Sequence, residues 1–401
     1  MVEMNFKSIE DFDLTGKKVL LRVDINSSID IENYSIREDP RIRAILPTLD
    51  RLKDSAVVLL AHQSRPGEKD FISLKLHADK IESYLPTKVQ FIEDIFGEKA
   101  IQAIKELKPG KILLLDNIRK WDRENVESSI EEAEQTELIQ KLSPYFDYFI
   151  NDAFGAAHRA QPSLIGWPTL ICGPLVKKEL DMVNKLLNPE HPSIMIVGGA
   201  KADDKFKALK YNLEKGNLDK ALIAGLTASM ILLAKGVKLS ETDTKLVKKY
   251  SDKLQGDILD VMQKFKAQIM LPVDIATEEN GQRKEISIDQ LNIIPYPIGD
   301  IGERTQKLYI NAIKSAKTVV ANGPPGIFEK EVFQKGTYRL IDAMNESDAY
   351  CVIGGGDMGA AAEMYGKTDN ITISTGGGAL LDILSGKKVP LLIALQSKPP
   401  K

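Results

Sequence analysis

Arginine and histidine side chains recur in the first half of the sequence, each just after a short apolar run. The positions are Arg41, His62, Arg65, Arg119, His158 and Arg159, and they are joined by Asp24 and Asn26. A guanidinium presents a planar fork that binds phosphate or carboxylate through two hydrogen bonds, whereas Asp and Asn exchange hydrogen bonds with hydroxyl groups. These residue types predict a site for a small ligand that carries phosphate, carboxylate and hydroxyl groups.

The first apolar run also contains polar residues that need an explanation. In KVLLRVDIN, Arg22, Asp24 and Asn26 alternate with apolar residues, as expected of a strand. Burying three such groups without partners would cost several kcal/mol in total. Each of them therefore requires either a partner in the fold or a ligand.

Each candidate in the first half also has a purely structural interpretation. Asp24 and Asn26 could turn the chain and cap a helix, and any single arginine could be a surface charge. His158 is interpreted as a supporting histidine that does not contact the ligand. Open parallel sheets, however, bind ligands beyond the carboxyl ends of their strands, and the candidates follow successive strands. Their joint placement favours a common site.

The second half begins with a different pattern, in which glycines follow the strands. The segment IMIVGGAKADDK combines an apolar run, the pair Gly198–Gly199 and the start of a helix, whose backbone N–H groups could bind phosphate. Lys201 and Lys205 are four residues apart and are expected on one helical face, with a polyanion between them. The alternative is a solvated face on which Asp203 and Asp204 offset the lysines. The segment is not a Walker A loop, because it lacks GxxxxGK[ST].

A second glycine turn, YCVIGGGDMG, places Gly354, Gly356 and Gly359 in the spacing GxGxxG. A dinucleotide site also requires an acid at the end of the next strand, about 20 residues further on, where this sequence has Ser374 instead. Asp357 in this turn could bind Mg²⁺ on nucleotide phosphates, or it could simply cap the helix.

A third glycine turn, STGGGALL, again follows a strand and opens a helix. Between the turns, VVANGPPGIFE supplies Asn322, the rigid pair Pro324–Pro325 and Glu329. Glu329 could bond ribose hydroxyls or remain an exposed acid in the first turn of a helix. Three such turns in one sheet predict a polyphosphate ligand that crosses the strand ends.

Short apolar runs that alternate with helical patterns position all of these residues. In order they are KVLLRVD, AVVLLAH, VQFIED, KILLLDN, YFIND, SIMIVGG, ALIAG, QIMLPVD, TVVANG, AYCVIGGG and ITISTGG. Continuous Val/Ile/Leu runs are typical of strands buried on both faces, hence of parallel sheets with helical crossovers. The sequence predicts an α/β fold with two doubly wound domains. Between them, GPLVKKELDMVNKLLNPEHP predicts an interdomain helix, although a further crossover helix would give the same pattern.

Length and composition limit the class of protein. The chain has 401 residues, too many for one ordinary domain, and its net charge of −3 provides no basic field for nucleic acid or an acidic membrane. Two distant cysteines fit a reducing compartment and argue against a structural zinc site. We find neither a signal peptide nor an apolar span of about 20 residues, so we expect a cytoplasmic protein.

Taken together, the motifs resemble those of the phosphoglycerate kinase family. The matching segments are LRVDIN, HQSRPG, DNIR, NDAFGAAHR, GGAKADDK, LPVD, DIG, NGPPGIFE, GGGDM and STGGGALL, and they occur in family order. Each motif is moderately specific, but the ordered series covers nearly the whole chain. Ser64 stands where most members have glycine, and this and other departures resemble the archaeal branch of the family.

The resemblance implies two Rossmann-like domains with parallel sheets facing a central cleft, joined by an interdomain helix. The expected boundaries are 1–170 for a 3-phosphoglycerate domain, 171–190 for the helix and hinge, and 191–384 for a nucleotide domain, with about 385–401 packing back on the first. The implied reaction is reversible phosphoryl transfer from 1,3-bisphosphoglycerate to MgADP, giving 3-phosphoglycerate and ATP, with hinge closure that excludes water. A monomer is the expected state.

The resemblance also implies roles for individual residues. Arg41 and Lys201 would neutralise the transferring phosphoryl group, Asp357 would bind Mg²⁺, and Glu329 would bind the ribose. The implied substrate-binding residues are Asp24, Ile25, Asn26, Arg41, His62, Gln63, Ser64, Arg65, Arg119 and Arg159. The implied nucleotide-binding residues are Gly199, Ala200, Lys205, Gly225, Asn322, Pro324, Glu329, Gly354, Gly355, Gly356, Asp357, Met358, Gly377 and Gly378.

Two other functions fit parts of the pattern. The GxGxxG spacing would suit an NAD-dependent oxidoreductase, but the acid that binds the ribose is missing. A non-catalytic protein that binds anions would also use arginines and glycine turns. For such a protein, the combination of Lys201, Asp357 and three glycine turns would be excessive.

Overall fold

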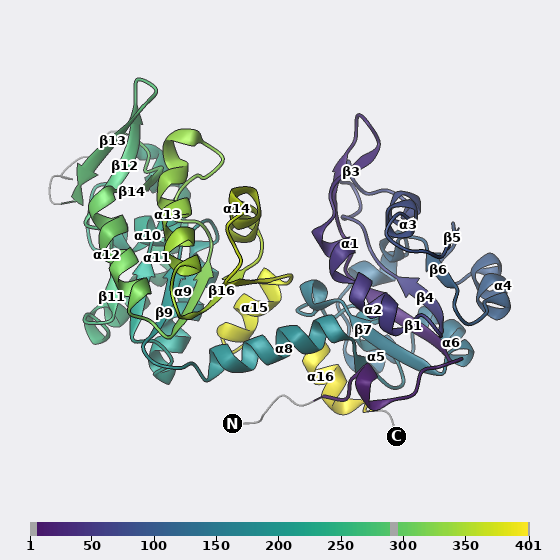
Figure 1. Cartoon of the computed structure of the whole chain (residues 1–401). Helices are drawn as coiled ribbons and strands as arrows, with labels where there is room; N and C mark the ends of the chain where they lie inside the picture. Colours follow the sequence, from purple (N-terminus) through teal and green to yellow (C-terminus); the bar gives the residue numbers. More distant parts are fainter. Residues whose placement is uncertain (1–5, 289–295, 400–401) are drawn as a thin grey trace. The chain divides into compact units, whose positions relative to one another are not determined.

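Parallel strands form the centre of each half of the chain, as the apolar runs predict. The computed structural model describes residues 6–288 and 296–399. The chain divides into two compact units, unit 1 (Met1–Met182 with Lys388–Lys401) and unit 2 (Val183–Lys387). In Figure 1 each unit consists of a sheet with helices packed against it. Both units are therefore of the predicted α/β class.

Unit 1 contains a six-stranded sheet in the order β5-β6-β4-β1-β7-β8, in which all neighbouring strands are parallel. Its strands are β1 (Lys18–Val23), β4 (Ala56–Leu60), β5 (Val89–Ile92), β6 (Ile112–Leu115), β7 (Tyr148–Asp152) and β8 (Ile171–Cys172). Its helices are α1 (Pro40–Ala44), α2 (Leu46–Arg51), α3 (Lys75–Glu82), α4 (Glu98–Glu106), α5 (Ile130–Glu134), α6 (Glu137–Leu142), α7 (Pro162–Ile165) and α16 (Pro390–Ser397).

The register of the central strands brings their carboxyl ends to one edge of the sheet. Arg22 in β1 pairs with Leu60 at the end of β4 on one side and with Asn151 near the end of β7 on the other. The three strands therefore end side by side. The loops that follow them, including the candidate residues, emerge together at this edge.

Unit 2 contains a second six-stranded parallel sheet, in the order β11-β10-β9-β15-β16-β17. Its strands are β9 (Ser193–Val197), β10 (Lys220–Ile223), β11 (Ile269–Met270), β15 (Thr318–Asn322), β16 (Tyr350–Gly354) and β17 (Ile371–Ser374). Its helices are α9 (Ala202–Lys215), α10 (Gly225–Ala234), α11 (Glu241–Lys264), α12 (Glu303–Lys314), α13 (Gln334–Asn345), α14 (Asp357–Tyr365) and α15 (Gly377–Leu384).

Two small antiparallel sheets are absent from the sequence-based prediction. One is the hairpin of β2 (Ser28–Asp30) and β3 (Ser35–Glu38), and the other is a sheet in the order β13-β12-β14. The latter is formed by β12 (Asp274–Glu279), β13 (Gln282–Ser287) and β14 (Asp300–Ile301). β2, β3 and β13 are polar and partly exposed, and β12 and β14, although largely buried, are short or interrupted by polar residues. These strands therefore lack the continuous apolar runs that indicated the parallel strands.

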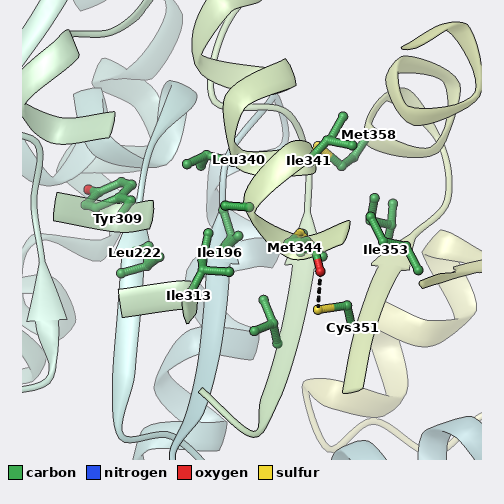
Figure 2. Packing of buried hydrophobic residues seen from close by; sticks show 14 of the residues in the cluster. Ile196, Leu222, Tyr309, Ile313, Leu340, Ile341, Met344, Cys351, Ile353 and Met358 are labelled. Carbon is green, nitrogen blue, oxygen red and sulfur yellow. Dashed lines mark hydrogen bonds between the residues drawn. The ribbon is translucent and has the colours of Figure 1, made fainter. Parts of the chain in front are cut away.

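The core of unit 2 lies between its sheet and the helices that cross it. Figure 2 shows Ile196 and Leu222 from the sheet packed near Tyr309 and Ile313 of α12. Met358 of α14 belongs to the same buried cluster and is fully buried. The side chain of Met358 therefore serves packing, so the predicted nucleotide contact of this residue could come only from its backbone.

Helix α8 (Pro174–Leu187) occupies the segment for which the sequence predicts a helix between the two sheets. Its first turn is held by Asp152 at the end of β7, whose carboxylate accepts from the N–H of Val176 at 2.9 Å. Burial raises the pKa of Asp152 to about 6, although the hydrogen bond from Thr48 opposes this shift. Position and contacts thus tie α8 to the edge of the unit 1 sheet.

The C-terminal segment packs on unit 1. The backbone N–H of Leu391 in α16 donates to Ala157 at 3.2 Å, and the ammonium of the buried Lys398 pairs with Glu134. Residues 400 and 401 of the segment expected at 385–401 lie outside the described residues. Within the described ranges, none of the helices has both the length and the apolar character that a bilayer crossing requires.

Candidate functional site

The strand ends of unit 1 form a pocket of about 400 Å³. It is lined by Asp24, Asn26, Arg41, His62, Ser64, Arg65, Glu68, Asp70, Arg119, Gly155 and Arg159. We refer to it as the unit 1 pocket. Eight of the ten substrate-binding residues expected from the sequence lie in its wall, contributed by the loops after β1, β4, β6 and β7 and by α1. The structure therefore brings the four candidate arginines together.

Asp24 organises the side of the pocket formed by the loop after β1. Its Oδ1 accepts from Nη1 of Arg41 at 3.1 Å and from the backbone N–H of Asn26 at 3.2 Å. Asp24 is nearly buried, whereas Arg41 is 38% exposed, so the guanidinium extends from a buried anchor toward the opening. Arg41 can thus present its remaining N–H donors to a ligand while its position stays fixed.

Ser64 connects three parts of the pocket wall. Its N–H donates to Oδ1 of Asn26 at 2.7 Å, its carbonyl accepts from Nη1 of Arg119, and its hydroxyl donates to Asp70. Ser64 has φ +55°, the left-handed region that glycine adopts without steric cost. The bond to Asp70 compensates for part of the strain, and Asp70 is a pocket residue that the sequence analysis missed.

Two of the arginines present buried donors without partners. Arg119 is 4% exposed, and among the described residues neither its Nε nor Nη1 of Arg159 has a hydrogen-bond partner. Burial, together with the neighbouring Arg65 and Arg41, lowers the pKa of Arg159, whereas Asp24 raises it. Unsatisfied buried donors are costly, and an anion within reach of them would relieve that cost.

His62 lines the pocket as a buried imidazole. Burial and the neighbouring Arg22, Arg159 and Arg41 hold its pKa well below the ordinary value. At neutral pH the ring is therefore uncharged, so it could offer a ligand a hydrogen bond but no charge.

Two expected substrate-binding residues do not line the pocket. Ile25 is fully buried in the core of unit 1, so its side chain cannot reach a ligand. Gln63 is also fully buried and bonds to the backbone of Ser27 and to His77, which fixes the loop. For these two residues the predicted substrate contact could therefore come only from the backbone.

Arg22 and Asn117 are polar strand-end residues with structural partners. Asn117 bonds to the N–H and carbonyl groups of Gln63 and to the N–H of Arg119, and so it joins the loops after β4 and β6. Arg22 bonds to Ser163 and His62 and lies 4.0 Å from Glu124. The polar face of the first strand thus meets partners in the fold as well as the pocket.

In unit 2 the strand-end loops are built from backbone. The N–H of Gly198 donates to the carbonyl of Asn322 at 3.0 Å, and that of Gly199 donates to Pro324 at 2.7 Å. A Cβ on Gly225 would lie 2.4 Å from the nitrogen of Gly199. The loops after β9, β10 and β15 therefore pack so closely that only glycine fits, and we call them, with those after β16 and β17, the glycine loops.

The same close packing joins the loops after β16 and β17. A Cβ on Gly355 would lie 2.5 Å from the carbonyl oxygen of Ser374, and one on Gly377 would lie 3.0 Å from Gly355. The side chain of Asn322 lies against Gly354, where a Cβ would be 2.8 Å from its Nδ2. Gly356 and Gly378 are exposed, as is Ala200 in the loop after β9.

Lys201 and Lys205 do not share a helical face, contrary to the expectation from their spacing. Lys201 precedes α9 at its N-cap, with φ +58°, and is exposed. Lys205 is 6% exposed and donates to the carbonyl of Gly198. Asp203 and Asp204 lie within ion-pair distance of Lys207 and so are not dedicated to Lys201. The left-handed N-cap residue breaks the helical period and directs the two ammonium groups differently.

Burial governs the charge of Lys205. It lowers the pKa of the ammonium to about 8, while Asp357 raises it and Lys201 lowers it. Asp357 is exposed in the first turn of α14, where Gly356 is the N-cap, so the alternative that Asp357 caps this helix is wrong.

Asp357 fits a magnesium ion bound together with nucleotide phosphates. Mg²⁺ usually takes one or two carboxylates, with phosphates and water completing its coordination. Among the described residues, no three His, Cys, Asp or Glu side chains are grouped as a self-sufficient metal site. Glu329, expected at the ribose, is exposed in the loop after β15.

The chain is similar to known proteins over nearly its full length. Residues 9–387 match the profile of a family described as phosphoglycerate kinase. The phosphoglycerate kinase of Methanococcus maripaludis is 43% identical over 402 residues, covering 96% of this chain and 97% of the relative. That of Methanothermus fervidus is 40% identical over 399 residues, covering 98% of this chain and 97% of the relative.

Solved structures give the same result. The crystal structure of phosphoglycerate kinase from Pyrococcus horikoshii OT3 has a TM-score of 0.90 and 38% identity, with 97% of this chain and 98% of that chain covered. Phosphoglycerate kinase from Coxiella burnetii has a TM-score of 0.80 and 31% identity, with 99% and 100% covered. The similarity therefore includes both units.

Proposed function

The chain belongs to the phosphoglycerate kinase family, and from this we propose that the unit 1 pocket binds the phosphoglycerate while the glycine loops of unit 2 bind the nucleotide. Its activity is that of a phosphotransferase with a carboxyl group as acceptor, in glycolysis. The reaction interconverts 1,3-bisphosphoglycerate and ADP with 3-phosphoglycerate and ATP. Family membership thus decides against the NAD-dependent oxidoreductase that the GxGxxG spacing allowed.

One observation carries the assignment of the pocket: the buried, unpartnered donors of Arg119 and Arg159. A phosphate or carboxylate accepts several hydrogen bonds at once and brings the negative charge that four converging guanidiniums require. Asp24 and Asn26 supply groups that bond to the glycerate hydroxyl. The side chains that line the pocket thus suit the phosphate, carboxylate and hydroxyl groups of 3-phosphoglycerate.

The proposed catalysis consists of positioning and charge neutralisation. Phosphoryl transfer passes through a loose transition state with charge spread over the transferring group, so no general base is required. Arg41, anchored by Asp24, would stabilise this charge from the side of unit 1. Lys201, exposed at the start of α9, would do so from the side of unit 2.

Nucleotide phosphates are proposed to lie on the backbone N–H groups of the glycine loops, with Lys205 beneath them. The Mg²⁺ ion that Asp357 would hold supplies charge that neutralises the phosphate oxygens. Pro324, Gly225 and Asn322 are proposed to border the nucleotide, and Glu329 to bond to its ribose.

Several broader properties are part of the same proposal. A monomeric state and a cytoplasmic location remain predictions.

Transfer requires the two bound ligands to meet, so we propose that the units close by hinge bending in the segment 171–190. Small-angle scattering of the full chain with both ligands should show a smaller radius of gyration than without them, and an unchanged radius would contradict closure.

Turnover of the full chain tests the function directly. ATP should form from 1,3-bisphosphoglycerate and ADP in the presence of Mg²⁺, and EDTA should abolish its formation. Arg159→Ala should lower the reaction at subsaturating phosphoglycerate, whereas Arg43→Ala, which changes an exposed arginine of α1, should not. If the purified, folded chain formed no ATP, the proposed function would be wrong.

A further inference from the structure

The buried Arg22 contacts the one histidine of the unit 1 pocket. Arg22 lies in β1 with no exposed surface, and its Nη2 is 3.1 Å from Nδ1 of His62 in the loop after β4. Its Nε donates to Oγ of Ser163 at 2.9 Å, and its Nη1 donates to the carbonyl of Val23 at 2.5 Å. Every nitrogen of this guanidinium therefore has an acceptor, and for Nη2 this acceptor is the imidazole.

Glu124 and Ser163, which pack against Arg22, hold its guanidinium in place. The carboxylate of Glu124 accepts from the N–H of Ser163 at 3.0 Å and from its hydroxyl at 2.6 Å. The same carboxylate lies 4.0 Å from Nη2 of Arg22, and both side chains are fully buried. The orientation of Arg22 is thus determined by groups that do not line the pocket.

The contact between Arg22 and His62 has only one consistent protonation state. A guanidinium donates hydrogen bonds and never accepts them, so Nδ1 of the imidazole must be the acceptor. A charged imidazolium carries hydrogen on both nitrogens and has no acceptor to offer. The ring must therefore be neutral and must carry its single hydrogen on Nε2.

We propose that Arg22 is a positioning residue that holds His62 as the neutral Nε2–H tautomer, with this N–H donating to an oxygen of the pocket ligand. The ligand's identity as phosphoglycerate rests on the proposed function, whereas the tautomer rests on the fold alone. Within the described residues Nε2 of His62 has no hydrogen-bond partner, and the ring lines the pocket. Its donor is thus available to a phosphate or carboxylate oxygen.

The cations nearest to His62 favour the neutral ring. They are Arg22 from β1, Arg41 from α1 and Arg159 from the loop after β7, whereas His77 from α3, whose own pKa burial lowers to about 4, is uncharged near neutral pH. Of the carboxylates nearby, Asp24 accepts from Arg41, Glu124 from Ser163 and Asp70 from Ser64, and Glu68 also lines the pocket. Adding a proton to His62 would therefore place a further positive charge among cations in a buried site.

The arginines and His62 therefore have different roles in the pocket. The arginines supply charge, and His62 supplies a directed donor whose state does not change between pH 6 and 8. Any change in substrate affinity over this range should then follow the second ionisation of the substrate phosphate, whose pKa is about 6, and not the histidine.

Nitrogen NMR of the ligand-free full chain tests the tautomer without any mutation. The chain has four histidines, so ¹⁵N-histidine labelling gives few signals, and those of His62 are identified by their loss in His62→Gln. The expected result is a protonated Nε2, an unprotonated Nδ1 and no titration from pH 8 to pH 6. A protonated Nδ1, or titration in this range, would overturn the proposal whatever the ligand is.

Addition of 3-phosphoglycerate separates this proposal from the proposed function. A shift of the Nε2 signal on binding supports the donor role. An unshifted Nε2 in a chain that binds the compound and turns over would refute the donor role alone. If neither binding nor turnover occurs while Nε2 is protonated, the proposed function fails and the assignment of a phosphoglycerate oxygen to Nε2 fails with it.

Two substitutions of His62 form a matched pair. The amide of His62→Gln can place an N–H near the position of Nε2, whereas the shorter His62→Asn can only replace the acceptor near Nδ1. We expect His62→Asn to raise the KM for 3-phosphoglycerate about tenfold more than His62→Gln does, since it lacks the donor. Equal effects, or the reverse order, would contradict the proposed direction of the hydrogen bond.

The role of Arg22 itself is tested in a variant that also removes the charge of Glu124, so that neither of the two buried charges is left without its partner. Arg22→Met combined with Glu124→Gln removes both charges, and Glu124→Gln alone is the control. The double variant should allow the neutral ring to carry its hydrogen on Nδ1 as well as on Nε2, because Nδ1 no longer faces a donor, and should raise the KM more than it lowers kcat. If the folded double variant kept the hydrogen on Nε2 alone, Arg22 would not be the residue that sets the tautomer.

Discussion

The loops at the strand ends of the two parallel sheets, which we propose bind the ligands, present different chemical groups. In unit 1 the loops present side chains: guanidiniums, one imidazole and carboxylates that anchor them. In unit 2 the loops present backbone, and glycines allow neighbouring loops to approach within distances that a Cβ would not permit. We therefore propose that the same α/β architecture supports two kinds of anion site.

The difference follows from the ligands that each site is proposed to bind. A small acid with a phosphate, a carboxylate and a hydroxyl group is distinguished by directed donors, which arginine and histidine supply. A polyphosphate chain needs many similar donors along its length, which successive backbone N–H groups supply without side chains. Substitutions should accordingly act through charge and direction in unit 1 and through backbone collision in unit 2.

The largest effect is expected at the one catalytic side chain proposed in the glycine loops. Lys201→Ala should lower kcat by about 10²–10³-fold, because it removes a preorganised charge from the transition state, with a modest loss of nucleotide affinity. Steady-state kinetics with both substrates varied measures this. Lys207→Ala, which changes an exposed lysine of the same helix, is the control, and a near-normal kcat for Lys201→Ala would exclude the role.

In unit 1 the expected effect is on binding. Arg159→Ala should weaken 3-phosphoglycerate binding by about 10–100-fold, the range expected for a charged hydrogen bond, and should leave ADP affinity nearly unchanged. Calorimetric titration with each ligand measures both. The opposite pattern would reverse the assignment of the two ligands to the two units.

Backbone collision should be the dominant effect in the glycine loops. Gly323 has φ +83°, and a Cβ there would lie 2.2 Å from the carbonyl of Gly198, whereas Gly216 has φ +75° with nothing within 4 Å. Gly216→Ala should lower the unfolding free energy by about 1–2 kcal/mol through backbone strain alone. Gly323→Ala should lower it further and weaken ADP binding, as urea denaturation and nucleotide titration would show. Equal losses at both positions would mean that the loops are less closely packed than the structure indicates.

The pH dependence of nucleotide binding should reflect Lys205. Burial lowers the pKa of its ammonium to about 8, so ADP affinity should fall as pH rises above 8, by at most about tenfold per pH unit. Because the unfolded chain retains this proton up to about pH 10.5, Lys205 makes stability rise with pH between about 8 and 10.5. Titration of ADP binding from pH 7 to 9.5 checks the first effect, and Lys205→Met should remove it.

The smallest effect is expected at Ser64, the left-handed residue of the unit 1 pocket. Ser64→Gly relieves backbone strain of about 1–2 kcal/mol but loses a hydrogen bond worth about 0.5–1.5 kcal/mol, so the unfolding free energy should change by less than about 1 kcal/mol. Chemical denaturation measures it. A larger loss would show that the bond to Asp70 stabilises the pocket more than a typical hydrogen bond does.

Much of the fold follows from local sequence patterns. Every apolar run identified as a strand is a strand of one of the two parallel sheets, because burial on both faces requires continuous apolar residues. The two antiparallel sheets were missed because their strands are short or interrupted by polar residues, which are exposed in β3 and β13 and partly buried in β12. The relation between Lys201 and Lys205 was misjudged because a left-handed N-cap residue has no reliable signature in a non-glycine position.

The sequence by itself determined the residue types at each strand end, the glycine turns and the family. Only the tertiary structure decided which polar groups face the ligand and which are bound within the fold, as the burial of Arg22, Ile25, Gln63 and Met358 shows. The physical reason is that partners such as Arg22 and His62, or Ser64 and Asp70, meet through strand order, register and loop conformation. These long-range and three-dimensional relations leave no periodic trace along the chain.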